Sequence, residues 1–212
     1  MTLGRISAVT VYCSSSNSVD ACYFDAARRV GAALAKSGRT LVYGGGKVGL
    51  MGEAARACRA GGGRVVGVIT QTLKDAEQMD PDNHEVIVVE TMRERKRLLE
   101  QRGEAMVVLP GGLGTMEEFF EILVGRLLGE HEKPIVVINT PEPGSGGKSG
   151  FYDPMLSMID HMIAQKFAKP GVRGLFAVCS DPEEMSRALD EFERSPRTVI
   201  DRRSLVPSGT GG

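Results

Sequence analysis

Several residue types and patterns are scarce in this sequence of 212 residues, which has no tryptophan and only 5% aromatic residues. Its formal net charge is −1, so no overall charge attracts the chain to nucleic acid or to an anionic membrane. No apolar run is long enough to span a bilayer, and the first residues show no signal-peptide pattern. We therefore expect a cytoplasmic protein without nucleic-acid or membrane partners.

Cysteine and histidine are also few. The sequence has four cysteines that form no CxxC pair, which is typical of reduced core residues in a cytosolic protein. Its three histidines lie far apart and show no ligand spacing. The sequence therefore predicts neither a metal site nor a bound cofactor.

Short β-branched runs alternate with longer helical patterns along most of the chain. The predicted strands cover residues 7–12, 40–43, 64–69, 85–89, 105–109, 134–139 and 175–179. The predicted helices lie near residues 20–37, 50–61, 92–102, 116–128, 153–166 and 182–193. This alternation predicts one α/β domain over residues 1–194, a mostly parallel sheet with helices on both faces. Residues 195–212 are expected to form a flexible tail, and a ligand site is expected where the strand order reverses.

The first of three glycine-rich loops follows the predicted strand 40–43. It fits GxGxxG through Gly44, Gly46 and Gly49 and opens a helix. A dinucleotide site would also need an acidic residue at the end of the next strand, but Thr70-Gln71-Thr72 stands there. Two interpretations stay open: a tight strand-to-helix turn, or a contact of Gly45 and Gly46 with a phosphate or ribose.

The second loop, residues 142–149, is close to the P-loop pattern GxxxxGK[ST]. Glu142 stands where that pattern needs its first glycine, and a carboxylate there would oppose a triphosphate. The next helix is also delayed to Asp153-Pro154, with Asp153 expected as its cap. We interpret this loop as a flexible surface insertion that does not bind ATP.

The third loop runs from Leu109 to Glu118 and leaves a very apolar strand. It has three glycines, and the next helix is expected to begin at or beside Thr115. A helix N-terminus after glycines is a suitable anion site, which favours phosphate binding. The alternative is structural, because Thr115-x-x-Glu118 also fits a capping box.

A basic helix, residues 92–102, precedes that strand. Arg95 lies three residues after Met92 and four before Leu99, so the three share one helix face. If Met92 and Leu99 pack inward, the Arg95 guanidinium points toward the sheet and needs an anionic partner. Either a protein carboxylate or a ligand fits that requirement.

Two motifs together make the sequence resemble a known family. Met92-x-x-Arg95-Lys96, followed by Pro110-Gly111-Gly112-x-Gly114-Thr115-x-x-Glu118, resembles the LONELY GUY phosphoribohydrolases, which activate cytokinins. The resemblance implies a Rossmann-like fold and hydrolysis of nucleoside 5′-monophosphates, typically N6-prenylated AMP and sometimes AMP, to free base and ribose 5-phosphate. It also implies a homodimer or a higher homo-oligomer, with the site near the subunit interface.

The resemblance also implies roles for individual residues. By position, Arg95 and Glu118 match the catalytic pair, and Glu77 matches a further binding glutamate. The expected substrate-binding residues are Gly45, Gly46, Glu77, Lys96, Gly111, Gly112, Leu113, Gly114, Thr115, Met116 and Glu117. The sequence departs from the family at Val124, where plant-like members have threonine, and at Cys13-Ser14, where a glycine often precedes the serines. Both departures concern the choice of base.

The chemistry of glycosyl cleavage suggests a catalytic role for each of these residues. Breaking an N-glycosidic bond builds positive charge on the ribose, which a carboxylate such as Glu118 can stabilise. Arg95 would hold Glu118 ionised, and the glycine-rich helix start would hold the 5′-phosphate. A function of another class stays open: a protein that binds or carries AMP-like nucleotides without turnover, in which Glu118 only caps its helix.

Overall fold

The computed structural model describes residues 5–76 and 78–194. It contains one seven-stranded sheet in the order β4-β3-β2-β1-β5-β6-β7. The strands are β1 (Ala8–Tyr12), β2 (Thr40–Tyr43), β3 (Val65–Thr70), β4 (Glu85–Val89), β5 (Ala105–Val108), β6 (Ile135–Ile138) and β7 (Ala177–Cys179). Every neighbouring pair is parallel, and in the central pair Val9 is opposite Ala105. The predicted α/β class and parallel sheet are confirmed.

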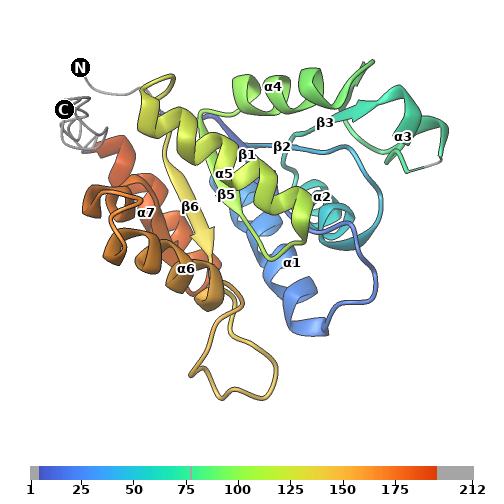
Figure 1. Ribbon diagram of the computed structural model, residues 1–212. Coiled ribbons are helices and arrows are strands. Elements are labelled where there is room, and N and C mark those ends of the chain that lie inside the picture. The colour runs from blue at the N-terminus through green and yellow to red at the C-terminus, as the bar shows by residue number, and fades with distance from the viewer. Residues whose placement is uncertain (1–4, 77, 195–212) are drawn as a thin grey trace.

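Helices cover both faces of this sheet (Figure 1). They are α1 (Ala21–Lys36), α2 (Gly49–Ala60), α3 (Gln71–Asp75), α4 (Met92–Arg102), α5 (Leu113–Leu128), α6 (Asp153–Ala164) and α7 (Pro182–Arg194), with a 3-10 helix at Pro170–Leu175. One apolar core lies between the sheet and α1, α2 and α7, and the other between the sheet and α4, α5 and α6. Because both faces are covered, the central strands β5 and β6 are buried at every position.

The apolar stripe predicted for α5 is confirmed. Phe119 and Leu123 are buried in the second core, and Met116, Phe120 and Leu127 pack against it. The start of this helix differs from the prediction. It begins at Leu113, two residues before Thr115, and Gly112 occupies the N-cap position without a side-chain cap.

The proposed capping box is therefore wrong. Thr115 is the third residue of α5 and Glu118 the sixth, so neither occupies the position that a capping box requires. The sequence pattern placed the helix start too late because glycine is a poor helix former, yet Gly112 and Gly114 lie at the start of α5. Glu118 consequently needs another explanation than helix capping.

Two short elements were not predicted, and two boundaries moved. The helix α3 has five residues, and the 3-10 helix ends at Leu175, so β7 begins only at Ala177. Tyr152, and not Asp153, occupies the N-cap position of α6. The Asp153 carboxylate nevertheless accepts a hydrogen bond from the Gly150 amide at 2.8 Å. Single helical turns bury too few side chains to show a periodic pattern.

The near-P-loop is an ordered turn. Pro141 and Gly150 form an antiparallel bridge, and the Glu142 amide donates to the Ser149 carbonyl at 3.0 Å. The Ser149 hydroxyl donates to the Glu142 carboxylate at 2.8 Å, so this glutamate closes the loop. Most residues of the loop are exposed, as predicted for a surface insertion, and these bonds define its backbone conformation.

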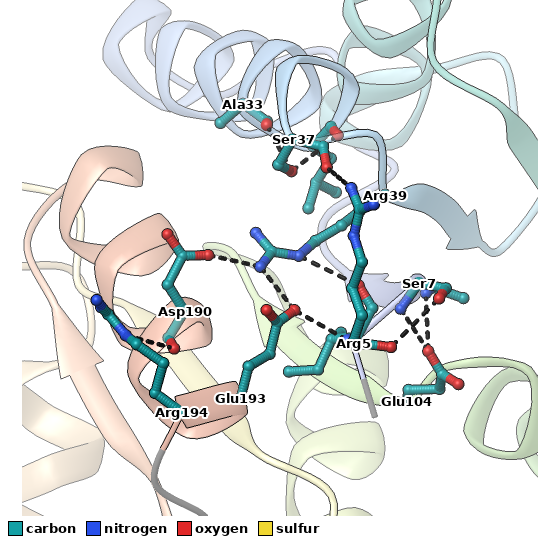
Figure 2. A network of polar contacts seen from close by, with 12 residues as sticks. Arg5, Ser7, Ala33, Ser37, Arg39, Glu104, Asp190, Glu193 and Arg194 are labelled. Atoms are coloured by element: carbon teal, nitrogen blue, oxygen red, sulfur yellow. Dashed lines mark hydrogen bonds and ion pairs between the residues drawn. The ribbon is translucent and has the colours of Figure 1, made fainter. Parts of the chain in front are cut away.

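A polar network connects the helix α7 to the residues that precede β1 and β2 (Figure 2). Arg39 is 4% exposed and forms ion pairs with Asp190 at 2.6 Å and Glu193 at 2.9 Å, both on α7. Glu193 also accepts from the Ile6 amide at 2.9 Å. The contacts join residues 151 to 187 apart in sequence and hold α7 against the first core. None of the described helices is long and apolar enough to cross a membrane.

Candidate active site

The cavity that holds most of the expected site residues, called the main cavity of this site, lies at the carboxyl edge of the sheet, beside the position where strand order reverses between β1 and β5. Its volume is about 370 Å³. Its walls come from residues 14–16 after β1, from Gly44 after β2, from α4 and from the first turns of α5. The sheet topology thus brings together segments that are far apart in sequence, as expected for this class of sheet.

The N-terminus of α5 offers backbone donors to the cavity. The amides of Leu113, Gly114 and Thr115 have no intrahelical acceptor, and no hydrogen bond from them occurs within the described residues. All three residues line the cavity. Because the helix dipole adds positive potential there, this end of α5 is suited to bind a phosphate.

The N-terminus of α2, after the GxGxxG loop, differs in this respect. The Gly49 amide donates to the Asn17 side chain at 2.8 Å, and the Leu50 amide donates to the Ser14 carbonyl at 2.9 Å. Its first donors are thus bonded within the protein, and they would have to be released before a phosphate could bind. The geometry favours α5 over α2 as the phosphate site.

Arg95 projects from α4 beneath the cavity and is only 7% exposed. Thr91 caps this helix through the Glu94 amide, which fixes the register that turns Arg95 toward the sheet. Arg95 Nε donates to the Val68 carbonyl at 2.9 Å, and Nη2 donates to the Gly44 carbonyl at 2.8 Å. The partners of Arg95 Nε and Nη2 are therefore backbone carbonyls. Neither a protein carboxylate nor an anionic ligand is needed to satisfy these two donors.

Met92 and Leu99, which share a helix face with Arg95, differ in their exposure. Leu99 is 1% exposed and packs inward, but Met92 is 47% exposed and lines the cavity. Only one of the two side chains therefore meets the condition set for an inward Arg95, because the first turn of α4 lies at the sheet edge, where the core has ended. The apolar side chain of Met92 is instead available to a ligand.

Glu118 faces the same cavity from the second turn of α5 and is partly buried. Burial raises its pKa from 4.5 to about 7, although Arg95 opposes this shift. Burial likewise lowers the pKa of Arg95, and the negative charge of Glu118 opposes that change. A carboxyl group with this pKa exchanges protons near neutral pH, which suits general acid–base chemistry.

Lys96 joins the two helices at the edge of the cavity. Its Nζ atom lies 2.8 Å from a carboxylate oxygen of Glu117 and 3.3 Å from one of Glu121. The hydrogen bond with Glu117 is the largest cause that raises the pKa of Lys96, so this side chain is cationic. It brings positive charge to the cavity between α4 and α5.

Most of the residues expected in the site meet in this cavity. Those lining it are Arg95, Lys96, Gly112, Leu113, Gly114, Thr115, Glu117 and Glu118. Glu77 lies outside the described residues. The other four expected residues, which are Gly45, Gly46, Gly111 and Met116, are not part of its wall.

These four residues have different environments, and Met116 packs against the second core. Gly45 packs against β3 with a φ of 76°, and Gly46 forms a bridge with Met79. Gly111 lines a neighbouring apolar cavity of about 300 Å³. A Cβ on Gly111 would lie 2.1 Å from Thr115 Oγ1, so glycine there leaves room for the threonine that lines the main cavity.

Part of the cavity wall comes from residues that the sequence motifs do not indicate. Tyr12, Met51 and residues 14–16 line the cavity, but none of them was named as a binding residue. Tyr12 is 3% exposed, and burial raises its pKa, with Glu118 adding to the shift, so its phenol stays protonated. Parallel sheets bind ligands where the strand order reverses, and this rule indicates the loop after β1 as well as the loop after β5. It could therefore have identified residues 14–16.

The described residues contain no group of three or more His, Cys, Asp or Glu side chains placed to hold a metal ion. What the cavity does contain is a helix N-terminus with free donors, a buried guanidinium and a carboxyl that titrates near neutral pH. Fold and site together define a Rossmann-like α/β protein whose cavity combines a helix N-terminus suited to a phosphate with an acid–base group.

Comparison with known proteins narrows this class to one family. The family described as possible lysine decarboxylase matches residues 51–189. A cytokinin riboside 5′-monophosphate phosphoribohydrolase of Rhodococcoides fascians is 40% identical over 89% of both chains. One from Arabidopsis thaliana is 35% identical over 89% of this chain and 79% of its own length. The chain belongs to the LONELY GUY family of phosphoribohydrolases.

Solved structures resemble the fold. The molybdenum cofactor carrier protein of Chlamydomonas reinhardtii has a TM-score of 0.67 and 19% identity, covering 90% of this chain and 100% of its own. The molybdenum cofactor binding protein of Rippkaea orientalis has a TM-score of 0.64 and 18% identity, covering 91% of this chain and 99% of its own. At these identities the likeness concerns the fold alone.

Proposed function

We propose that this protein hydrolyses the N-glycosidic bond of a cytokinin-type nucleoside 5′-monophosphate, giving free base and ribose 5-phosphate. The observation that supports it most is one cavity in which Glu118 and Arg95 lie beside the unbonded N-terminus of α5. The family membership supports the same reaction, since the curated relatives have that activity in their names.

The phosphate of the substrate binds first in this proposal. It accepts hydrogen bonds from the amides of Leu113, Gly114 and Thr115, and Lys96 adds a positive charge. Binding energy from the phosphate fixes the ribose and brings C1′ to Glu118. The base then lies against the apolar side chains of Met51 and Met92, which line the same cavity.

Glu118 performs the chemistry. As the bond between C1′ and the base nitrogen breaks, its electron pair leaves with the base and positive charge develops on the ribose. The Glu118 carboxylate stabilises that charge and accepts a proton from the attacking water, and the departing base takes up a proton from solvent. Arg95, fixed by the Val68 and Gly44 carbonyls, favours the ionised form of Glu118.

The products distinguish this reaction from its alternatives. Incubation with N6-prenyl AMP and with AMP is expected to release base and ribose 5-phosphate in equal amounts, as measured by chromatography. Adenosine and inorganic phosphate would identify a phosphatase and refute the proposal. Tight binding without any release would instead favour the nucleotide carrier, the second class considered from the sequence.

We propose further that the chain acts in the cytoplasm as a homodimer or larger homo-oligomer. Exposed apolar side chains on α5 support the assembly, since Val124 is 46% and Leu128 59% exposed, one helical turn apart. Light scattering coupled to gel filtration tests it, and a mass equal to one chain at micromolar concentration would contradict it. A phosphorylated substrate supports the cytoplasm as compartment, and cell fractionation tests that point.

A further inference from the structure

The glycine that follows β2 touches the arginine of the active site. The Gly44 carbonyl accepts a hydrogen bond from Arg95 Nη2 at 2.8 Å. A Cβ atom on residue 44 would lie 2.0 Å from that same nitrogen and 3.2 Å from Arg95 Cζ. Non-bonded carbon and nitrogen atoms do not approach to 2.0 Å, so any side chain at position 44 must displace the guanidinium.

Residue 44 must be a glycine because of the space around it, and not because of its backbone conformation. Gly45 has a φ of 76°, whereas Gly44 is not among the glycines with positive φ. An alanine at position 44 is therefore free of the strain that a left-handed conformation would impose. The effect of adding one methyl group can thus be assigned to the contact with Arg95.

The displaced side chain would lose its fixed position. Arg95 is held by two backbone carbonyls from neighbouring parts of the sheet, Val68 within β3 and Gly44 directly after β2. Met51 Sδ, which would lie 3.0 Å from the added Cβ, belongs to a flexible side chain that shifts at small cost. The open space beside Arg95 is the cavity itself, where a displaced guanidinium would meet the substrate and not the sheet.

We propose that Gly44 is a positioning residue for the reaction: its missing side chain is the space in which the Arg95 guanidinium is held against the sheet edge. This inference rests on the proposed function for its catalytic consequence, but not for its geometry. The inference also gives the GxGxxG loop a role, because its first glycine, Gly44, leaves the space that Arg95 occupies. The amides at the start of α2, which such a loop would offer to a phosphate, are bonded to Asn17 and Ser14.

The test is G44A, measured alone and in an R95A background. In the wild-type background, kcat/KM is expected to fall by roughly tenfold to a hundredfold, because the guanidinium is misplaced by about an ångström or more. In the R95A background the same methyl group meets no guanidinium, so G44A is expected to change kcat/KM by less than about twofold. Equal losses in both backgrounds would show a purely structural role and overturn the proposal.

A second readout needs no substrate and separates this inference from the proposed function. The pKa of the Glu118 carboxyl is followed by NMR with ¹³C-labelled glutamate, and E118Q assigns the signal. Displacing the guanidinium is expected to change this pKa in G44A, whereas in the R95A background G44A leaves it unchanged. An unchanged pKa in G44A would refute the inference even if the enzyme hydrolyses its substrate as proposed.

Folding is monitored by circular dichroism in the same series. If G44A unfolds while the double variant G44A/R95A folds, the clash with Arg95 is its cause and the inference stands. If both unfold and R95A alone folds, the glycine serves packing independently of Arg95, and the inference is wrong.

Discussion

Lys96 of α4 and Glu117 of α5 form an ion pair with 2.8 Å between Nζ and a carboxylate oxygen. Their sequence neighbours Arg95 and Glu118 lie in the same cavity, yet no direct ion pair joins those two among the described contacts. The outer pair therefore holds the two helices together, while Arg95 and Glu118 do not neutralise each other by a direct ion pair. Because Arg95 stays at a distance, it lowers the pKa of Glu118 without cancelling the effect of burial.

The first prediction concerns turnover by E118Q. Glutamine keeps the size of the side chain but carries no negative charge for the ribose cation and accepts no proton from water. We expect kcat to fall by a factor of order 10² or more, with KM changed much less. Steady-state kinetics measure it, and circular dichroism confirms the fold.

The pH dependence gives an internal control for that variant. Wild-type kcat/KM is expected to fall about tenfold for each unit below pH 7, since protonation removes the carboxylate that a pKa of about 7 provides. The residual activity of E118Q should lack this acidic limb. Wild-type turnover by E118Q, or the same limb in both proteins, would exclude Glu118 as the titrating group.

The second prediction concerns stability. The pKa of Glu118 is raised in the folded state, so the folded protein binds its proton more tightly than the unfolded chain does. The free energy of unfolding therefore decreases as pH rises from about 4.5 to 7, by at most about 3 kcal/mol from this group. E118Q should gain stability relative to wild type over that range and keep the gain at pH 8. Urea unfolding at pH 5 and pH 8 measures it, and a difference that is independent of pH would contradict it.

Much of the architecture could be predicted because it depends on patterns that lie within single elements. All seven strands were placed from their β-branched runs, and the stripe with Phe119 and Leu123 was read from helical periodicity. Arg95 was also correctly turned inward, since its spacing to Leu99 is local information. The position of the cavity followed from topology alone, because parallel strands have their ligand sites at the carboxyl edge.

The remaining features depend on contacts that no local pattern contains. Whether Arg95 is bonded to a carboxylate, a ligand or a carbonyl is decided by Val68 and Gly44, which are 27 and 51 residues away. The GxGxxG loop looked like a phosphate site because the sequence does not reveal that the α2 donors are already bonded to Ser14 and Asn17. The start of α5 was misplaced because tertiary packing overrides the low helix propensity of glycine.

The third prediction concerns the near-P-loop. Lys148 lies in the ordered turn that Glu142 and Ser149 close, and it does not line the main cavity. We expect K148A to change kcat/KM for monophosphate hydrolysis by less than about twofold, as is usual for surface substitutions. A large loss of turnover with an unchanged circular dichroism spectrum would assign the loop a function.

The last prediction tests the phosphate site at the start of α5 by improving the helix. Gly112 has ordinary negative φ, and a Cβ there would meet no atom within 4 Å, so a side chain fits. Aspartate is a preferred N-cap residue, and its charge interacts favourably with the helix dipole, so G112D should stabilise the fold by about 0.5 kcal/mol. The same carboxylate occupies the donors proposed for the substrate phosphate and repels its charge. We therefore expect KM for the nucleoside monophosphate to rise about tenfold or more, the equivalent of 1.4 kcal/mol or more, despite the gain in stability.

Two matched variants separate charge from bulk. G112A adds a Cβ without a cap, and G112N adds a neutral cap, so KM is expected to increase in the order G112A, G112N, G112D. Binding of the corresponding nucleoside, which lacks the phosphate, should differ little among the three, as measured by calorimetry. A KM for G112D equal to that of G112A would mean that the phosphate binds elsewhere. A parallel loss of nucleoside affinity would mean that residue 112 contacts the sugar or the base, and the α5 N-terminus would then lose its assigned role.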